Sequence, residues 1–307
     1  MLTDNEFFFQ SIVSNLYYLW TLRGYVARIE ISLPSKYDSY IKKSQEIAKK
    51  AEILDKKVAE YAYLGLDKKI IDSEIIITPY TIDLELLTNK LFDINIDTTI
   101  TDKINQVQVG NINPTKEQVQ DMELINNEAK KIANEFIEFA TDLYNKVNNQ
   151  EVFTFFYNTI NLYLIEIAKT YQESLERLKE KATINPSYVI DYQYESTLRM
   201  QAIATFIRGE IDPIYKDIFD KANDFVIEYR NIISEYENMT MTPNNQKNMT
   251  INSLELVKRL KLFVEECIKK LLKKEIYFIS PPTTKDNMLT AINFFIFNLE
   301  ELIKNNN

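Results

Sequence analysis

The residues of this chain that could do metal chemistry are carboxylates on expected core helices. Asp191, Glu195, Glu265 and Glu266 fall on such helices, and carboxylate oxygens suit a hard cation. The chain of 307 residues contains 45 acidic residues, however, and most carboxylates on long helices face solvent. We therefore expect these four side chains to be solvated. A metal site built from carboxylates alone stays as the alternative.

Nucleophilic chemistry lacks its usual partners in this sequence. The chain contains no histidine and one cysteine, Cys267, so it forms no internal disulfide. A thiol nucleophile usually needs a basic partner such as histidine. We expect Cys267 to be a small buried residue on a helix face. No phosphate-binding glycine loop, Ser-His-Asp set or zinc-ligand spacing is found either. The sequence predicts no catalytic residue and no cofactor.

Charge and the N-terminal segment limit the partners. A net charge of -9 disfavours nucleic acid, which requires a basic face, and also disfavours anionic membrane surfaces. The start, "MLTDNEFFFQSIVSNLYYLW", lacks the basic residues and cleavage site of a signal peptide. Polar residues interrupt its apolar run, so it does not resemble a membrane span. We expect a cytoplasmic protein.

The sparse helix breakers indicate long helices. The chain has only 4 glycines and 8 prolines, and apolar residues recur at spacings of three and four. Beside a helix that includes the apolar stripe from Met122 to Val147, the pattern predicts helices over these ranges: Glu6–Ser32, Ser35–Leu64, Pro79–Phe92, Glu151–Lys181, Pro186–Arg208, Pro213–Glu237, Ile251–Lys274 and Pro282–Lys304. Thr78 and Asp212 are expected N-caps, each with proline at the first helical position. The polar segment 238–250 is expected to be a loop.

The two halves of the chain follow the same order of elements. Each begins with a long amphipathic helix, a proline turn and a second helix that starts with tyrosine and lysine, and each ends with an aromatic-rich helix. We therefore predict an all-α protein of two tandem four-helix bundles. The first bundle spans residues 1–182 and includes a crossover segment, 66–113; the second spans residues 183–307.

Three segments carry a family resemblance. They are "FIRGEIDP", "ITPYTIDLELLTNKLFDINIDTTIT" and "PPTTKDNMLTAINFFIFNLEEL", in an order that generic helices would not reproduce. With them the chain resembles, over nearly its whole length, a bacterial family catalogued as domain of unknown function family 2935. That resemblance implies two tandem bundles of the ferritin-like type.

The resemblance also implies metal ligands that this chain does not have. Family members carry a Glu-His pair before the Phe-Ile-Arg-Gly element, and a His followed by a Glu-x-x-His-like triplet in the last helix. The matching positions here are Ala202, Ile203, Asn287, Ala291 and Phe294. In the first half they fall near Arg23, Gly24 and Tyr25, and near Phe155, Thr159 and Leu162. We expect Ala202, Ile203, Ala291 and Phe294 to be buried and to face one another, as a former metal site turned into ordinary core.

These observations favour a non-catalytic, metal-free bundle that acts as a structural or binding module. Its partner would be another protein or a small apolar ligand, and a homo-oligomer is left open. The alternative is a ferritin-like metal-binding protein or oxidoreductase that uses carboxylate ligands only.

Overall fold

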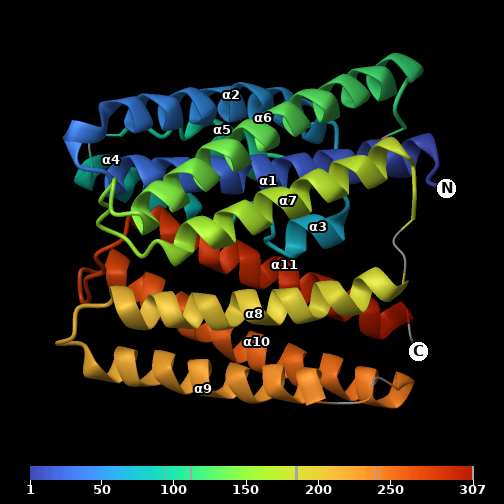
Figure 1. Ribbon diagram of the computed structural model, residues 1–307. Helices are drawn as coiled ribbons and strands as arrows, with labels where there is room; N and C mark the ends of the chain where they lie inside the picture. The colour runs from blue at the N-terminus through green and yellow to red at the C-terminus, as the bar shows by residue number, and fades with distance from the viewer. Residues whose placement is uncertain (93, 111–112, 184–185, 239, 241, 306–307) are drawn as a thin grey trace. The chain divides into compact units, whose positions relative to one another are not determined.

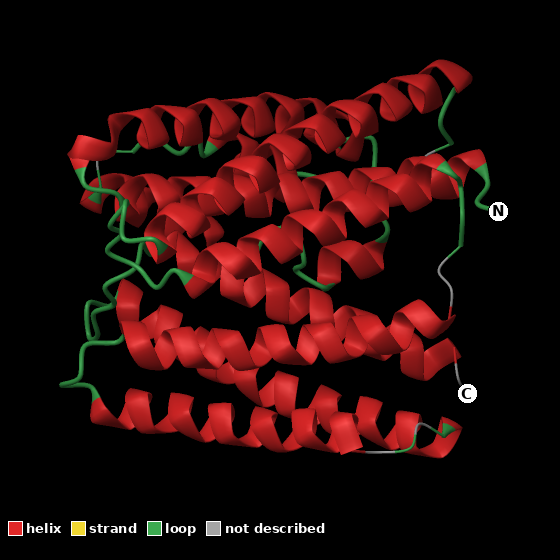
Figure 2. Cartoon of the chain, in the orientation of Figure 1, coloured by secondary structure: helices red, strands yellow, loops and turns green. Residues whose placement is uncertain are grey.

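The computed structural model describes residues 1–92, 94–110, 113–183, 186–238, 240 and 242–305, with backbone only at 186–191, 243 and 305. Its regular structure is helical, and two isolated β-bridges, Leu66 with Val109 and Ile211 with Phe278, are the only extended pairings in the described part (Figures 1 and 2). The prediction of an all-α fold is confirmed. None of the helices within the described residues combines the length and hydrophobicity needed to cross a membrane.

The chain divides into two compact units. The first contains residues 1–72 and 85–183, and the second contains residues 73–84 and 184–307. We expected the whole crossover, 66–113, to belong to the first bundle. That expectation is wrong for residues 73–84, which pack with the second unit. Residues 184 and 185 of the expected junction lie outside the described residues.

Four long helices form the first unit. They are α1 (Asp4–Ser32), α2 (Asp38–Ala62), α6 (Lys116–Asn148) and α7 (Thr159–Lys179), and a one-turn 3₁₀ helix (Ser35–Tyr37) joins the first two. Helix α1 packs along α2, α6 packs along α7, and α1 with α7 and α2 with α6 complete the bundle. Capping boxes start two of these helices, because Thr3 and Thr115 each exchange hydrogen bonds with the residue three positions later.

Four more long helices form the second unit. They are α8 (Pro186–Glu210), α9 (Lys216–Asn238), α10 (Pro243–Leu272) and α11 (Thr283–Asn305). Helix α8 packs along α9 and α10 along α11, and α10 also contacts α8 and α9. The core between them is apolar and includes Tyr229, Leu260, Cys267 and Phe295.

The crossover contains three short helices rather than one. They are α3 (Lys68–Asp72), α4 (Thr81–Leu91) and α5 (Thr99–Asn105). Helix α4 begins two residues later than expected, so Pro79 precedes it instead of occupying its first position. Thr78 instead closes a turn: its N–H donates to Thr81 Oγ1 (2.8 Å) and its carbonyl accepts from Thr81 N (3.3 Å).

Other helix starts also differ from the prediction, and three of them have a clear local cause. Helix α7 begins at Thr159 rather than Glu151, because Phe155 N donates to Ser32 O (2.8 Å) in an extended connection. Helix α9 begins at Lys216, after a turn in which Ile214 N donates to Asp212 Oδ1 (3.0 Å). Most of the polar segment 238–250 is helical, since Thr242 caps α10 and Pro243 stands at its start. Met239 and Met241 lie outside the described residues.

Candidate functional site

A buried ion pair lies at one end of the second unit. Lys285 Nζ donates to Glu210 Oε2 (2.8 Å) and to Ser280 Oγ (2.7 Å), and Ser280 Oγ donates to the same carboxylate oxygen (2.6 Å). The side chains of Lys285 and Glu210 are fully buried, and the ammonium lies 4.2 Å from the centre of the Phe278 ring. Two charges are tolerated in such a place when they are paired and hydrogen-bonded to each other. This trio of Glu210, Ser280 and Lys285 is called the lysine cluster below.

Backbone pairing brings the members of the lysine cluster together. Glu210 is the last residue of α8, and Lys285 lies in the first turn of α11. Ile279 N donates to Glu210 O (2.9 Å) and Asp212 N donates to Tyr277 O (3.2 Å), around the bridge between Ile211 and Phe278. This short antiparallel contact fixes Ser280 beside the end of α8.

A buried carboxyl group follows Lys285 directly in the sequence. Asp286 Oδ1 accepts a hydrogen bond from Thr78 Oγ1 (2.6 Å), whereas Asp286 Oδ2 is buried without a hydrogen-bond partner among the described residues. Burial raises the pKa of Asp286 to about 6, with the threonine hydrogen bonding opposing the rise. Thr78 belongs to residues 73–84, which explains how that part of the crossover is anchored to the second unit.

The first unit buries an arginine between two acids. Arg23 Nη1 donates to Asp55 Oδ2 (3.3 Å) and Arg23 Nη2 donates to Glu85 Oε1 (3.4 Å). Thr101 Oγ1 donates to the other oxygen of Glu85 (2.9 Å), and the guanidinium lies 4.7 Å from the centre of the Trp20 ring. Residues Arg23, Asp55, Glu85 and Thr101 are called the arginine cluster. They come from α1, α2, α4 and α5, so the cluster ties two long helices to two crossover helices.

Of the two acids in the arginine cluster, Asp55 has a carboxylate oxygen that accepts no hydrogen bond from the described residues. Its side chain is fully buried, and Oδ1 has no hydrogen-bond partner among the described residues. Burial raises the pKa of Asp55 to about 7, although the Arg23 charge lowers it and Glu52 adds a smaller rise. Asp55 therefore changes charge near neutral pH, where an ordinary aspartate does not.

A chain of neutral hydrogen bonds crosses the first unit. Tyr171 Oη donates to Asn15 Oδ1 (2.5 Å), Asn15 Nδ2 donates to Asn126 Oδ1 (2.7 Å), and Asn126 Nδ2 donates to Ser11 Oγ (2.9 Å). These side chains are buried and come from α1, α6 and α7. Because each bond needs a defined helix register, the network favours one packing of the bundle over others.

In the arginine and lysine clusters, the acids are paired with cationic side chains of the chain itself. Their charged side chains are almost completely shielded from solvent, and Arg23 and Lys285 place a covalently attached cation beside the acids. No group of three or more acidic, histidine or cysteine side chains is arranged to hold a metal ion within the described residues. A buried carboxylate costs free energy unless a cation or hydrogen bonds compensate it, and here the chain itself provides the cation.

The five positions matched to family ligands do not form one site. Ala202, Ile203 and Asn287 are buried, whereas Ala291 and Phe294 are half-buried. Ile203 belongs to the apolar core and Ala291 packs at its edge, but Ala202 and Phe294 are not part of that core. The Phe294 ring instead meets Tyr192 edge to face, 6.4 Å between centres. The expectation that Ala202, Ile203, Ala291 and Phe294 are all buried is therefore wrong for Ala291 and Phe294.

The first-unit positions that match family ligands also lie in different environments. Arg23 lies in the arginine cluster, whereas Phe155 is 63% exposed and Leu162 is 39% exposed. Thr159 is the first residue of α7. Arg23 of this set therefore belongs to a buried polar cluster, whereas Phe155 and Leu162 lie at the surface.

Three of the four candidate carboxylates have described side chains, and none of the three belongs to a group that could hold a metal ion. Glu195 is exposed, and the side chain of Asp191 lies outside the described residues. Glu265 lies between Lys261 (3.9 Å) and Lys269 (3.8 Å), and Glu266 lies between Lys221 (2.9 Å) and Lys270 (2.8 Å). Lysines therefore neutralise Glu265 and Glu266.

Two further residues were assigned from the sequence. Cys267 is fully buried in the core, and burial raises the pKa of its thiol to about 12, which fits an inert apolar role. The sequence predicts an Arg208 that is exposed or extends to solvent, with an ion pair to Glu210 or Asp212 as the alternative. Arg208 is half-buried and donates to Asn223 Oδ1 (2.7 Å), and Glu210 pairs with Lys285.

The buried clusters were missed although several of their residues stand in the three segments that carry the resemblance. Glu210 lies in "FIRGEIDP", Thr78 and Glu85 lie in "ITPYTIDLELLTNK", and Lys285 with Asp286 lies in "PPTTKDNM". The signal available in the sequence was the presence of charged and hydroxyl residues inside segments that generic helices would not reproduce. Their partners are distant in sequence, so the pairing itself could not be read from the chain.

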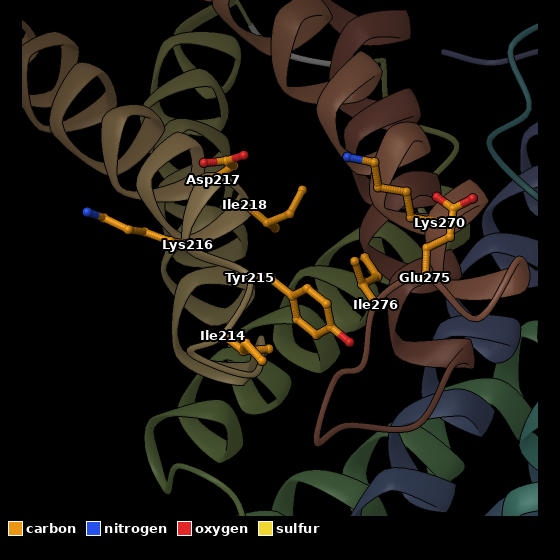
Figure 3. Close-up of a pocket in the computed structure, with 8 residues that line it drawn as sticks. All are labelled: Ile214, Tyr215, Lys216, Asp217, Ile218, Lys270, Glu275 and Ile276. Carbon is orange, nitrogen blue, oxygen red and sulfur yellow. The ribbon is translucent and has the colours of Figure 1, made fainter.

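The second unit also has an open hollow on its surface, of about 380 Å³ (Figure 3). Residues from the start of α9 and the end of α10 line it. They are Ile214, Tyr215, Lys216, Asp217, Ile218, Lys270, Glu275 and Ile276. Its apolar part consists of Ile214, Tyr215, Ile218 and Ile276, and is called the apolar hollow. The charged side chains are two lysines and two acids, so they contribute no net charge.

Comparisons with known proteins give a curated relative and several similar solved structures. The chain is 23% identical over 302 residues to the spore coat protein CotB of Clostridioides difficile (strain 630), and the match covers 98% of both chains. It is similar to the crystal structure of an uncharacterised protein from Bacillus cereus G9241, with a TM-score of 0.69 and 14% identity over 96% of this chain and 91% of that one. The similarity to the Bacillus cereus structure shows that the two proteins share a fold. No protein-family model matches the chain.

Proposed function

We propose that this chain is a non-catalytic structural component of a spore coat. The observation that carries the proposal is the end-to-end similarity to spore coat protein CotB, which covers 98% of both chains. A match of that extent includes both units and the crossover, so it does not come from one common helical pair.

The arrangement of charged groups supports a structural role. The acids of the arginine and lysine clusters are buried against Arg23 and Lys285, where no substrate has access. Such pairs specify one packing arrangement and contribute little to reactivity. The one thiol of the chain, Cys267, is buried. Burial raises the pKa of this thiol and keeps it in the unreactive protonated form.

The family relation and the location belong to the same proposal. We propose that the chain is a member of domain of unknown function family 2935, with two tandem ferritin-like bundles whose metal ligands have been lost. Support comes from the three resembling segments, which provide residues of both buried clusters. We propose that the chain folds in the cytoplasm before it is incorporated, in agreement with its single buried cysteine.

Coat extraction tests the function. The tagged chain, expressed from its own promoter in the organism that encodes it, should be enriched in coat extracts of purified spores relative to whole-cell lysate. An unrelated cytoplasmic protein with the same tag is the control and should be depleted. Equal depletion of both proteins, or an organism that forms no spores, would refute the proposed function.

A further inference from the structure

Three buried polar atoms of the second unit have no hydrogen-bond partner among the described residues. They are Gln193 Nε2 on α8, Tyr236 Oη on α9 and Ser253 Oγ on α10. The three residues are 1%, 9% and 0% exposed. Buried polar groups are nearly always hydrogen-bonded, so three such atoms on three helices that pack together require a shared explanation.

Contacts between α8 and α10 bring two of these atoms into one region. Thr250 Oγ1 lies within hydrogen-bond distance of Gln193 Oε1 (3.2 Å), and both residues are buried. Ser253 follows Thr250 by three residues on α10, and Thr197 follows Gln193 by four residues on α8. Residues at these spacings share a helix face, so Ser253 and Thr197 lie one turn further along the same contact. Gln193, Thr197, Tyr236, Thr250 and Ser253 are called the hydroxyl–amide cluster.

Tyr236 extends into the same region from α9. Burial raises the pKa of Tyr236 to about 12, and the hydroxyl groups of Ser253 and Thr197 oppose the rise. Both hydroxyl groups therefore lie near Tyr236 Oη, although neither forms a hydrogen bond of standard geometry with it. Thr197 Oγ1 donates instead to Gln193 O (2.8 Å), within α8. The phenol and its polar neighbours are thus close together without being bonded directly.

The first unit satisfies a similar set of side chains by direct contact. There Tyr171 begins the chain of hydrogen bonds that passes through Asn15 and Asn126 to Ser11, on three helices. The hydroxyl–amide cluster also takes a tyrosine, a side-chain amide and a serine from three helices, but its three atoms do not meet. A small molecule that both donates and accepts hydrogen bonds would complete the corresponding network.

The chemistry of the three atoms selects that molecule. Gln193 Nε2 can only donate, whereas Tyr236 Oη and Ser253 Oγ can each donate or accept. The five residues of the cluster are uncharged, so an ion would be buried there without compensation. A buried water typically makes about three hydrogen bonds to polar groups that have no other partner. We propose that the hydroxyl–amide cluster holds one internal water, bound to Gln193 Nε2, Tyr236 Oη and Ser253 Oγ. This water joins α8, α9 and α10, and the inference does not depend on the proposed function.

A crystal structure of the full chain at high resolution tests the proposal directly. An ordered water should lie about 2.7–3.2 Å from Gln193 Nε2, Tyr236 Oη and Ser253 Oγ. A cluster without water, in which Tyr236 Oη bonds directly to Ser253 or Thr197, would overturn the proposal. A larger molecule bound to the same three atoms would also overturn it.

Two tyrosine variants provide a matched test in solution. Tyr236→Phe removes a hydroxyl group that binds the water. Tyr229→Phe removes a hydroxyl group from the apolar core, where Tyr229 Oη is also buried without a partner among the described residues. In urea unfolding of the full chain, Tyr236→Phe should raise the unfolding equilibrium constant about fivefold, which corresponds to one hydrogen bond. Tyr229→Phe should leave this constant unchanged or lower it, because an unsatisfied polar group is lost.

Coupling between distant partners distinguishes a shared water from a direct bond between Tyr236 and Ser253. Gln193→Met removes the amide and keeps a side chain of similar length. If both residues bind one water, the effects of Gln193→Met and Tyr236→Phe on the unfolding equilibrium constant should differ from additivity by about threefold or more. Additive effects of these two substitutions, or equal responses of the two tyrosine variants, would overturn the proposal. Far-UV circular dichroism should show unchanged helix content in every variant.

Discussion

Lys285 Nζ lies 2.8 Å from Glu210 Oε2, and both side chains are fully buried. The pair joins the last residue of α8 to the first turn of α11. It therefore connects the first long helix of the second unit to the last one. Its value to the fold depends on both charges being present, because either one alone would be buried without compensation.

Removing the lysine should destabilise the chain more than removing the whole pair. Lys285→Met leaves the Glu210 carboxylate buried beside Ser280, and such a change costs about 3–5 kcal/mol. The double variant Lys285→Met, Glu210→Leu replaces the pair by apolar groups and should cost less than the single change. Urea unfolding at pH 7 measures both. A double variant that is as unstable as the single one would show that Ser280 and the backbone pairing require the charges.

Asp55 should make the stability of the chain depend on pH. Its pKa is raised from 3.8 to about 7 in the folded chain, so the folded state holds a proton that the unfolded state has lost. The favourable contribution is complete below about pH 4 and disappears as the pH rises through 7. Asp55→Asn stays neutral throughout. Relative to that variant, the unfolding equilibrium constant of the wild type should therefore rise by up to about tenfold per pH unit between pH 4 and 7.

Asp286→Asn is the matched comparison for Asp55→Asn. Burial raises the pKa of Asp286 to about 6, so its contribution has the same sign and ends one unit earlier. Each variant should therefore lose the part of the pH dependence that its own carboxyl group supplies and keep the part that the other supplies. Identical pH profiles for the wild type and Asp55→Asn would show that Asp55 is ionised in the folded chain.

Cys267 should report unfolding without taking part in any chemistry. The thiol is fully buried and its pKa is raised to about 12 by burial, so a thiol-specific reagent should not react with the native chain. Labelling should appear in urea along the same transition as the loss of helix. Cys267→Ala serves as the unreactive control. Rapid labelling of the native chain would mean that the α10 core opens locally.

The sequence predicted the long helices well because their signals are local. The apolar stripe of α6 and Pro186 at the start of α8 lie in the elements that they define, whereas the local start signal of α10, Thr242 with Pro243, was read as part of a loop. A helix start that depends on contacts with residues far away in the sequence was predicted at the wrong position. Helix α7 was extended over 151–158, since nothing nearby indicates that Phe155 bonds to Ser32. The same reason explains why Arg23 was identified only as a matched position, while its partners Asp55 and Glu85 were not.

Metal binding separates the proposed structural role from its carboxylate-only alternative. Several acids are already neutralised: Glu265 and Glu266 by lysines of α9 and α10, and the acids of the arginine and lysine clusters by Arg23 and Lys285. A ligand that binds only the folded state must raise its melting temperature by mass action. We expect the melting temperature of untagged chain to be the same with iron, manganese, zinc or chelator. Glu195→Gln and Glu265→Gln should not alter that result. A saturable rise with micromolar iron or manganese, abolished by either substitution, would favour the metal-binding alternative over the structural one.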